Sequence, residues 1–163
     1  MSGATRVMPL TRELADALVD APDTVEERFG LTPVPGYLAF PEVLPALREA
    51  LDAGTPPQWS THLIVAGDEV VGLGGFTGAP VDGVVEIGYS IAPTRRGRGH
   101  ATEAARAWVA QARAAGVDRV VAYTLPEENP STAVLRRRGF RRDGESTDPD
   151  AGVVWRWALP LRG

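Results

Sequence analysis

The feature that most constrains the fold of this 163-residue chain is a strand joined to an amphipathic helix by a loop of arginines and glycines. The helix is predicted over 100–115, because small and apolar residues recur there at helical spacing and form one stripe. These residues are Ala101, Ala104, Ala105, Trp108, Val109 and Ala112. The strand is predicted over 84–91. A helix with one apolar stripe has to cover a sheet or another helix, so this unit indicates a layered α/β fold.

The rest of the sequence adds strands and short helices to this unit. Strands are predicted over 6–10, 59–66, 70–77, 119–125, 140–145 and 152–159, and helices over 11–20, 42–53 and from Asn129-Pro130 to Gly139. The stretch 21–58 contains seven prolines and is expected to form short helices joined by turns. The length suits one domain over residues 1–163. The expected fold class is therefore α/β, with a mixed sheet in one domain.

Composition excludes several kinds of chemistry. Cysteine is absent, which rules out disulfides, thiolate metal sites and a cysteine nucleophile. All 17 basic residues are arginines, so a lysine Schiff base is excluded as well. Two histidines are too few for a multi-histidine site, so no metal is expected. The chain has neither an apolar run of 18 residues nor a secretory signal pattern, which predicts a cytoplasmic protein without a membrane span.

The net charge of −4 conceals an uneven distribution of charge. Residues 91–142 contain eleven arginines and four acidic residues, whereas the remainder contains six arginines and seventeen acidic residues. Such segregation indicates a local anion site. A nucleic-acid partner is not expected, because the chain as a whole is acidic and its arginines lack interleaved aromatic residues.

The loop within this basic segment has the features of a phosphate site. It reads Ile91-Ala92-Pro93-Thr94-Arg95-Arg96-Gly97-Arg98-Gly99-His100-Ala101 and leads into the predicted helix. The first amides of a helix lack intrahelical partners and lie at the positive end of its dipole, and glycines let an anion approach them. A Walker loop is excluded because the chain has no lysine, and the glycine spacing does not fit a dinucleotide fingerprint. An ordinary surface turn with solvated arginines is the alternative.

Two motifs in this order resemble the signatures of the GNAT N-acetyltransferases. The run Arg96-x-x-Gly99-x-Ala101 resembles the family's Arg/Gln-x-x-Gly-x-Gly/Ala acyl-CoA signature, and the run from Asn129 to Gly139-Phe140 resembles its second signature. The resemblance spans about residues 59–159 and is greatest to the branch that acetylates the N-termini of ribosomal proteins. It implies the acyl-CoA N-acyltransferase fold, in which helices flank a mixed central sheet with two splayed parallel strands.

The resemblance also implies how acetyl-CoA, the expected cosubstrate, would bind between the strands 84–91 and 119–125. Backbone groups of Ser90 and Ile91 would bind the pantetheine arm. The pyrophosphate would be held by Arg96, Gly97, Arg98, Gly99, His100, Ala101 and Thr102. Asn129 is expected to contact the pantetheine, to cap the following helix, or both. The arginines 136–138 either meet the adenosine 3′-phosphate or form a solvated helix face.

Glu86 is the candidate catalytic residue. It shares one face of its strand with Gly88 and Ser90, whereas the alternate residues Val85, Ile87, Tyr89 and Ile91 are expected in the core. A carboxylate beside small residues on a central strand fits a cleft wall. Three roles stay open for it: general base, anchor of the substrate amine, or structural acid paired with an arginine. Many family members carry a tyrosine acid beside the position of Leu135, and this chain has none there.

The expected function is transfer of an acetyl group from acetyl-CoA directly to a primary amine, a peptide N-terminus or a small amine, through a ternary complex. A backbone N–H near Ile91 is the expected oxyanion donor. The alternative is a degenerate family member that binds acyl-CoA without turning it over. The walls of the amine pocket are expected from 21–58, 78–83 and 144–152, with Trp59 and His62 as candidates for its border. Tyr123 is expected in the core, and the protein as a monomer or homodimer.

Overall fold

The computed structural model describes residues 4–38 and 42–161. Eight strands form one sheet in the order β1-β3-β4-β5-β6-β8-β7, and the short β2 lies beside β4. The strands are β1 Thr5–Pro9, β2 Thr32–Pro33, β3 Thr61–Ala66, β4 Glu69–Phe76, β5 Val84–Ile91, β6 Arg119–Thr124, β7 Arg141–Asp148 and β8 Gly152–Pro160. The helices are α1 Arg12–Asp20, α2 Val25–Phe29, α3 Val43–Asp52, α4 His100–Ala114 and α5 Pro130–Arg137, with 3₁₀ turns η1 Pro22–Thr24, η2 Pro57–Trp59 and η3 Pro93–Arg95.

The predicted elements are confirmed, with boundaries that differ by a few residues. Two differences concern strands. β2 has two residues, one of them a proline, and pairs parallel with β4. It is too short to show the hydrophobic alternation by which a strand is predicted from the sequence. β7 extends to Asp148 rather than 145, because it pairs with β8 up to Gly152 while all of its residues remain exposed. A strand without a buried face carries no hydrophobic alternation, which leaves its end unmarked in the sequence.

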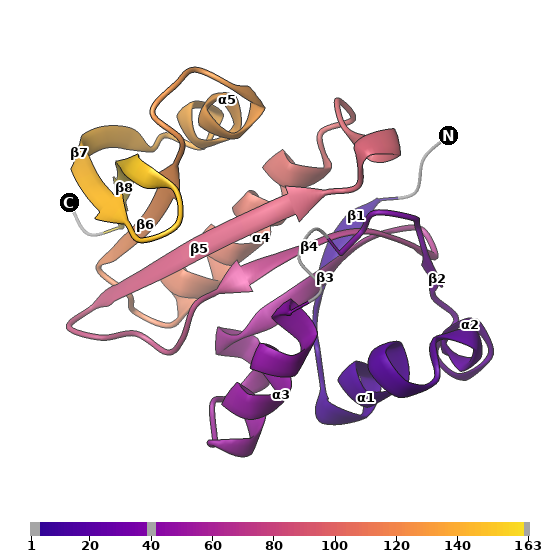
Figure 1. The fold of residues 1–163 in the computed structure, drawn as a ribbon. Helices are drawn as coiled ribbons and strands as arrows, with labels where there is room; N and C mark the ends of the chain where they lie inside the picture. Colours follow the sequence, from indigo (N-terminus) through magenta and orange to yellow (C-terminus); the bar gives the residue numbers. More distant parts are fainter. Residues whose placement is uncertain (1–3, 39–41, 162–163) are drawn as a thin grey trace.

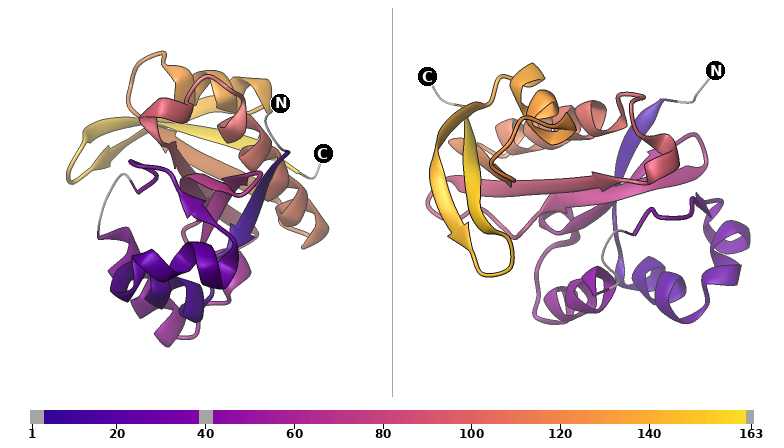
Figure 2. Two further views of the ribbon diagram at one scale, coloured as in Figure 1. Left: turned by 90° about the vertical axis from the view of Figure 1, so that its right-hand side faces the viewer. Right: turned by 45° about the horizontal axis from the view of Figure 1, so that its top comes forward.

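The helices form two layers, one on each face of the sheet (Figure 2). α4 and α5 lie on one face, and α1, α2 and α3 lie on the other. Successive side chains of β3 point to opposite faces of the sheet and so contribute to both hydrophobic clusters. Ile64 belongs to the cluster around Trp108 of α4, whereas Leu63 and Val65 belong to the cluster with α1 and α3. β3 and β4 are therefore buried on both faces, whereas on β5 the face that bears Glu86, Gly88 and Ser90 is only half-buried, with Gly88 exposed.

The parallel strands β5 and β6 separate after a short common stretch. They pair only over Val84–Glu86 and Arg119–Val121. Beyond that point β5 pairs with β4 as far as Ile91, and β6 pairs with β8 as far as Thr124 (Figure 1). The predicted mixed sheet with splayed parallel strands is therefore confirmed, and the strands open just past Glu86.

The same separation corrects one core prediction. Tyr123 has 41% of its surface exposed, so the expectation that it belongs to the core is wrong. It lies two residues beyond Val121, the last residue of β6 that pairs with β5, where the strands have already parted. Val85 and Ile87 are buried as predicted, and Tyr89 and Ile91 are half-buried. No helix in the described ranges is long and apolar enough to cross a membrane.

Candidate active site

The loop that enters α4 presents open backbone. Gly99 is the N-cap residue, with a left-handed φ of 83°, and no side chain caps the helix there. Gly97 has a φ of 77°. A Cβ added at either glycine would meet no heavy atom within 4 Å, so the loop surface is clear. The first residues of α4, His100, Ala101 and Thr102, line the adjoining pocket, and the first amides of a helix lack intrahelical partners and lie at the positive end of its dipole.

Two arginines brace this loop against the sheet. Arg95 donates to both carboxylate oxygens of Glu69 on β4, at 3.1 and 3.0 Å. That pairing lowers the pKa of Glu69 below its ordinary value. Arg96 donates from Nε to the carbonyl oxygen of Ile91 at 3.1 Å. These contacts fix the loop relative to β4 and β5, so Arg95 and Arg96 are not merely solvated.

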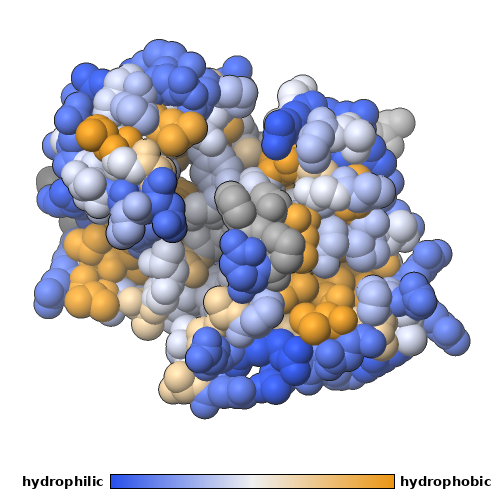
Figure 3. All heavy atoms as spheres, viewed as in Figure 1, coloured by the Kyte–Doolittle hydropathy of each residue, from blue (hydrophilic) through white to orange (hydrophobic). Residues whose placement is uncertain are grey.

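A pocket of about 680 Å³ opens beside this loop. It is lined by residues of β5, the η3 loop, the start of α4, the end of β6 and α5: Tyr89, Ser90, Ile91, Arg95, Arg96, Gly97, Gly99, His100, Ala101, Thr102, Leu125, Asn129, Pro130, Ser131, Ala133, Val134 and Arg137. The space-filling view is hollowed between α5 and the η3 loop (Figure 3). We call this cavity the larger pocket. Nine of the ten residues predicted to bind the coenzyme line it, and Arg98 does not.

The second motif closes the larger pocket from α5, and its arginines differ in position. Arg136 pairs with Glu128 at 2.5 Å and lies over the ring of Trp157, so its guanidinium is already engaged. Arg137 lines the pocket, and neither Arg136 nor Arg138 does. Sequence reasoning could not separate the three, because consecutive helical residues differ in direction by about 100° and the contacts of each come from distant strands.

Asn129 and His100 both have structural roles in the wall. Asn129 Oδ1 accepts a hydrogen bond from the backbone N–H of Thr132 at 3.0 Å, which confirms the predicted N-cap. Its side-chain nitrogen, Nδ2, has no hydrogen-bond partner among the described residues and can therefore bind a ligand. His100 is buried, and its Nδ1 lies 2.8 Å from Oγ1 of Thr5. Burial and the nearby Arg98 lower the pKa of His100, which favours a neutral ring at pH 7.

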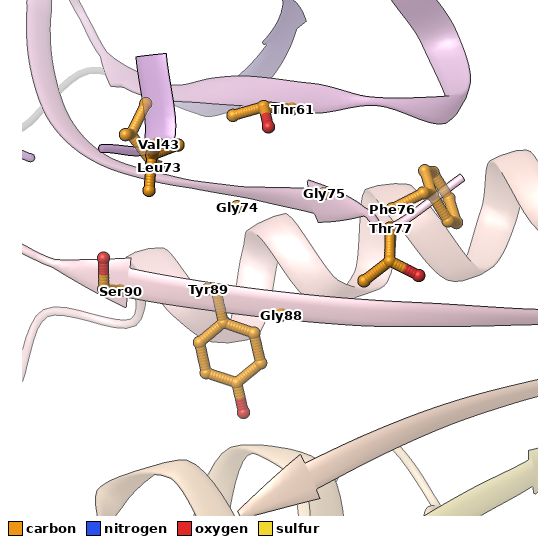
Figure 4. Close-up of a pocket in the computed structure, with 10 residues that line it drawn as sticks. All are labelled: Val43, Thr61, Leu73, Gly74, Gly75, Phe76, Thr77, Gly88, Tyr89 and Ser90. Carbon is orange, nitrogen blue, oxygen red and sulfur yellow. The ribbon is translucent and has the colours of Figure 1, made fainter. Parts of the chain in front are cut away.

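A second cavity of about 290 Å³, the smaller pocket, lies over β3, β4 and β5 (Figure 4). Its lining carries no charged side chain and consists of Val43, Thr61, Leu73, Gly74, Gly75, Phe76, Thr77, Gly88, Tyr89 and Ser90. The two pockets share Tyr89 and Ser90, whose side chains point in opposite directions. The two cavities therefore meet at these residues of the central strand β5.

The segments predicted to wall the amine pocket contribute little to the smaller pocket. Of the segments 21–58, 78–83 and 144–152, only Val43 contributes to the lining of the smaller pocket, and residues 39–41 lie outside the described ranges. Trp59 and His62 do not line it. Thr61 does, because alternation along β3 turns its neighbour His62 to the opposite face, against Trp108. The pocket is made mostly by the sheet itself.

Glu86 lies on the pocket face of β5, two residues before Gly88. It is half-buried, and burial raises the pKa of its carboxyl above the ordinary value. It lines neither pocket. Within residues 4–38 and 42–161, no arginine pairs with its carboxylate. The described residues therefore do not support the role of a structural acid paired with an arginine. The described residues also hold no group of three or more side chains suited to a metal ion.

The sequence matches the family model described as the acetyltransferase (GNAT) domain over residues 9–141. Among solved structures, Mycobacterium smegmatis RimJ in complex with CoA-disulfide is 23% identical, with a TM-score of 0.66, over 97% of this chain and 82% of that chain. The ribosomal alpha-N-protein acetyltransferase RimL in complex with coenzyme A is 19% identical, with a TM-score of 0.68, over 96% and 93%. The ribosomal-protein-S5-alanine acetyltransferase from Vibrio fischeri is 16% identical, with a TM-score of 0.67, over 99% and 97%. No curated protein sequence matches the chain.

The family match includes β3 to β6, α4 and α5, and thus both of the motifs that line the larger pocket. The similar folds include ribosomal-protein acetyltransferases, the branch that the sequence motifs resemble most. The chain belongs to the GNAT acetyltransferase family and is an acetyl-CoA-dependent N-acetyltransferase.

Proposed function

We propose that the protein transfers the acetyl group directly from acetyl-CoA to a primary amine, a peptide N-terminus or a small amine, in a ternary complex. One observation supports this most: a basic, glycine-lined pocket and an uncharged pocket meet at Tyr89 and Ser90. A donor in the larger pocket and an amine in the smaller one would be held side by side, and proximity of that kind supplies much of the rate of such reactions. The chain has no cysteine or lysine to form a covalent intermediate.

The residues of the larger pocket fit the coenzyme. The open amides of His100, Ala101 and Thr102 suit a pyrophosphate, and the glycines before them leave it room. Past Glu86, the edge of β5 that faces β6 has no strand partner among the described residues, so we place the pantetheine arm along this edge, beside Ser90 and Ile91, as an added strand would bind. The carbonyl oxygen of Ile91 there already accepts a hydrogen bond from Arg96. Acetyl-CoA supplies the activated thioester, and of the arginines 136–138 Arg137, which lines the pocket, is our candidate for contact with the 3′-phosphate.

The protein's own groups assist the transfer in three ways. A backbone N–H near Ile91 stabilises the charge that develops on the carbonyl oxygen as the amine nitrogen bonds to the carbonyl carbon. The amine gives up its proton before or during that attack, and the carbon–sulfur bond then breaks. No tyrosine occurs at 134–136, so the thiolate leaves unassisted or takes a proton from water.

Glu86 is our proposed general base, acting through a water molecule. Its place on the pocket face of β5 but outside the lining of the smaller pocket favours an indirect route. A raised pKa makes its carboxylate a stronger proton acceptor and moves its titration towards neutral pH. The same carboxylate can instead anchor the substrate ammonium, and the pH dependence of the rate separates these roles.

The experiment measures thiol release from acetyl-CoA with a panel of short peptides and small amines, while calorimetry measures acetyl-CoA binding on the same protein. We expect binding and amine-dependent thiol release. Binding with no thiol release from any amine would favour the second candidate, an acyl-CoA sensor, which the absence of a tyrosine at 134–136 keeps open. Failure to bind acetyl-CoA would contradict both candidates.

A further inference from the structure

The glycines of β4 are explained by the packing of the sheet. A Cβ added at Gly72 would stand 2.2 Å from a backbone oxygen, and one added at Gly74 would stand 2.4 Å from the ring of Trp108. At Gly75 it would stand 2.5 Å from the carbonyl oxygen of Ser60, and φ there is 126°. Each of these positions leaves no room for a side chain. The fold therefore requires glycine at all three.

Gly88 on β5 is different. A Cβ added there would meet no heavy atom within 4 Å, and the φ of Gly88 lies outside the left-handed region. A glycine inside a strand is less stable than an alanine there, because it loses more backbone freedom on folding. Packing and backbone geometry would both accept alanine at this central position. The fold does not explain this glycine, and the clear space above it calls for another occupant.

That clear space lies where the acceptor would react. Gly88 lines the smaller pocket and faces Gly75 across the β4–β5 ladder. The next residue on its face of β5 is Ser90, about 7 Å further along the strand, which both pockets share. Gly88 therefore lies in the smaller pocket directly beside Tyr89 and close to Ser90, the two residues that line both pockets (Figure 4).

We propose that Gly88 is a specificity-determining residue: its missing side chain lets the acceptor amine lie directly on the backbone of β5, and the clearance sets how large a substituent the amine-bearing carbon can carry. This inference rests on the proposed function. The pocket around Gly88 carries apolar and hydroxyl side chains and no charge. The acceptor class it fits is a primary amine whose nearest substituent is small and uncharged.

The test compares Gly88→Ala and Gly88→Val with Gly144→Ala. Gly144 is the control, because it also lies in a strand, at a register shift of β7, has a φ outside the left-handed region and would meet no atom within 4 Å, but it lines neither pocket. Acetyl-CoA affinity is measured by calorimetry and unfolding by a thermal melt. Turnover is measured with peptides that begin with glycine, alanine or valine.

We expect both alanine variants to melt at the wild-type temperature or up to about 4 °C above it, with acetyl-CoA affinity unchanged. For Gly88→Ala, kcat/KM should fall more steeply as the first residue of the peptide grows, by about tenfold or more for valine, since one methyl group that clashes in a site costs 1–3 kcal/mol. Gly88→Val should lose turnover with all three peptides, and Gly144→Ala should match the wild type.

Three results would overturn the assignment. A melting temperature of Gly88→Ala far below that of Gly144→Ala would mean that the glycine serves the fold. Weaker acetyl-CoA binding with an unchanged peptide preference would place the acyl group, not the acceptor, over Gly88. An active wild type whose peptide preference Gly88→Ala leaves unchanged would overturn this inference alone, whereas a wild type that releases no thiol with any peptide or amine would contradict the proposed function as well.

Discussion

The hydroxyl of Tyr89 donates a hydrogen bond of 3.0 Å to the carbonyl oxygen of Ser131, in the first turn of α5. This bond spans the opening between β5 and β6 and ties the central strand to the helix that closes the larger pocket. Burial raises the pKa of Tyr89 to about 12, so its proton stays in place at neutral pH. Tyr89 lines both pockets, and we interpret it as the residue that holds the opening at its working width.

Replacing Tyr89 with phenylalanine should therefore act mainly on coenzyme binding. The variant loses one hydrogen bond, which contributes about 1 kcal/mol to stability. With α5 less firmly held, we expect the KM for acetyl-CoA to rise several-fold while kcat changes little. Steady-state kinetics and calorimetry with acetyl-CoA measure both effects. Tyr123→Phe is the control, because Tyr123 is exposed and makes no hydrogen bond within the described ranges. A large fall in kcat at unchanged KM would instead give Tyr89 a part in the chemistry.

Glu86→Gln should remove the pH dependence that the proposed base confers. A base works in its deprotonated form, so the wild-type kcat/KM should increase with pH through the raised pKa of Glu86. Glutamine should lower turnover by about 100-fold or more and flatten that part of the profile. The matched control is Glu103→Gln on α4, since that carboxylate is exposed and pairs, among the described residues, with Arg106. An unaltered pH profile in Glu86→Gln would exclude the residue as the base.

Gly99→Asp should abolish acetyl-CoA binding and leave the fold intact. Aspartate tolerates the left-handed conformation better than most residues and is a favourable N-cap, so α4 should persist. Its carboxylate would occupy the amides and the positive field that we assign to the pyrophosphate. Calorimetry tests the affinity, and a thermal melt tests the fold. Gly30→Asp carries the same substitution at another left-handed, uncrowded glycine, the C-cap of α2, which lines neither pocket. Unchanged affinity in Gly99→Asp would contradict the pyrophosphate assignment.

The larger pocket could be predicted because its signals are local in the sequence. The αL glycine before α4, the Asn129 cap and the glycines that follow α4 and α5 all lie within a few residues of the element that they shape. Such preferences depend on residues that are close together in the sequence, so a short motif can predict most of the lining of the larger pocket. The smaller pocket has no comparable motif, because its lining comes from alternate residues of three strands and from α3.

The glycines show why the smaller pocket could not be predicted from the sequence. Gly74, which is followed by Gly75, and Gly88 both lie inside predicted strands, and the sequence does not show which of the two is required by packing. Gly74 is required by the ring of Trp108, 34 residues further along the chain, whereas Gly88 meets nothing. Only the packing of distant elements distinguishes a glycine whose neighbours exclude a side chain from one that has free space beside it. The exposure of Tyr123 could not be predicted for a similar reason, since alternation along a strand does not show where two paired strands separate.

His62 should make the stability of the fold fall as the pH is lowered. Its ring is buried edge-on to Phe76 and Trp108, and its Nδ1 lies 3.1 Å from the carbonyl oxygen of Ser60. A carbonyl only accepts, so the neutral ring carries its proton on Nδ1. Protonation would place a second N–H on Nε2, which has no partner in the described structure. Burial accordingly lowers the pKa of His62 from 6.5 to about 4.

The sign of the effect follows from where the proton binds. Between pH 6.5 and 4 the unfolded chain protonates His62 and the folded chain does not, so acid favours unfolding. The stability present above pH 6.5 should decrease by about 3 kcal/mol on approaching pH 4, at 1.36 kcal/mol for each pKa unit. Urea unfolding at pH 7.5, 6, 5 and 4.5 measures it. His62→Phe keeps an aromatic ring and removes the titration, so its stability should depend less on pH than that of the wild type. Equal pH dependence in the two proteins would contradict the buried, neutral His62.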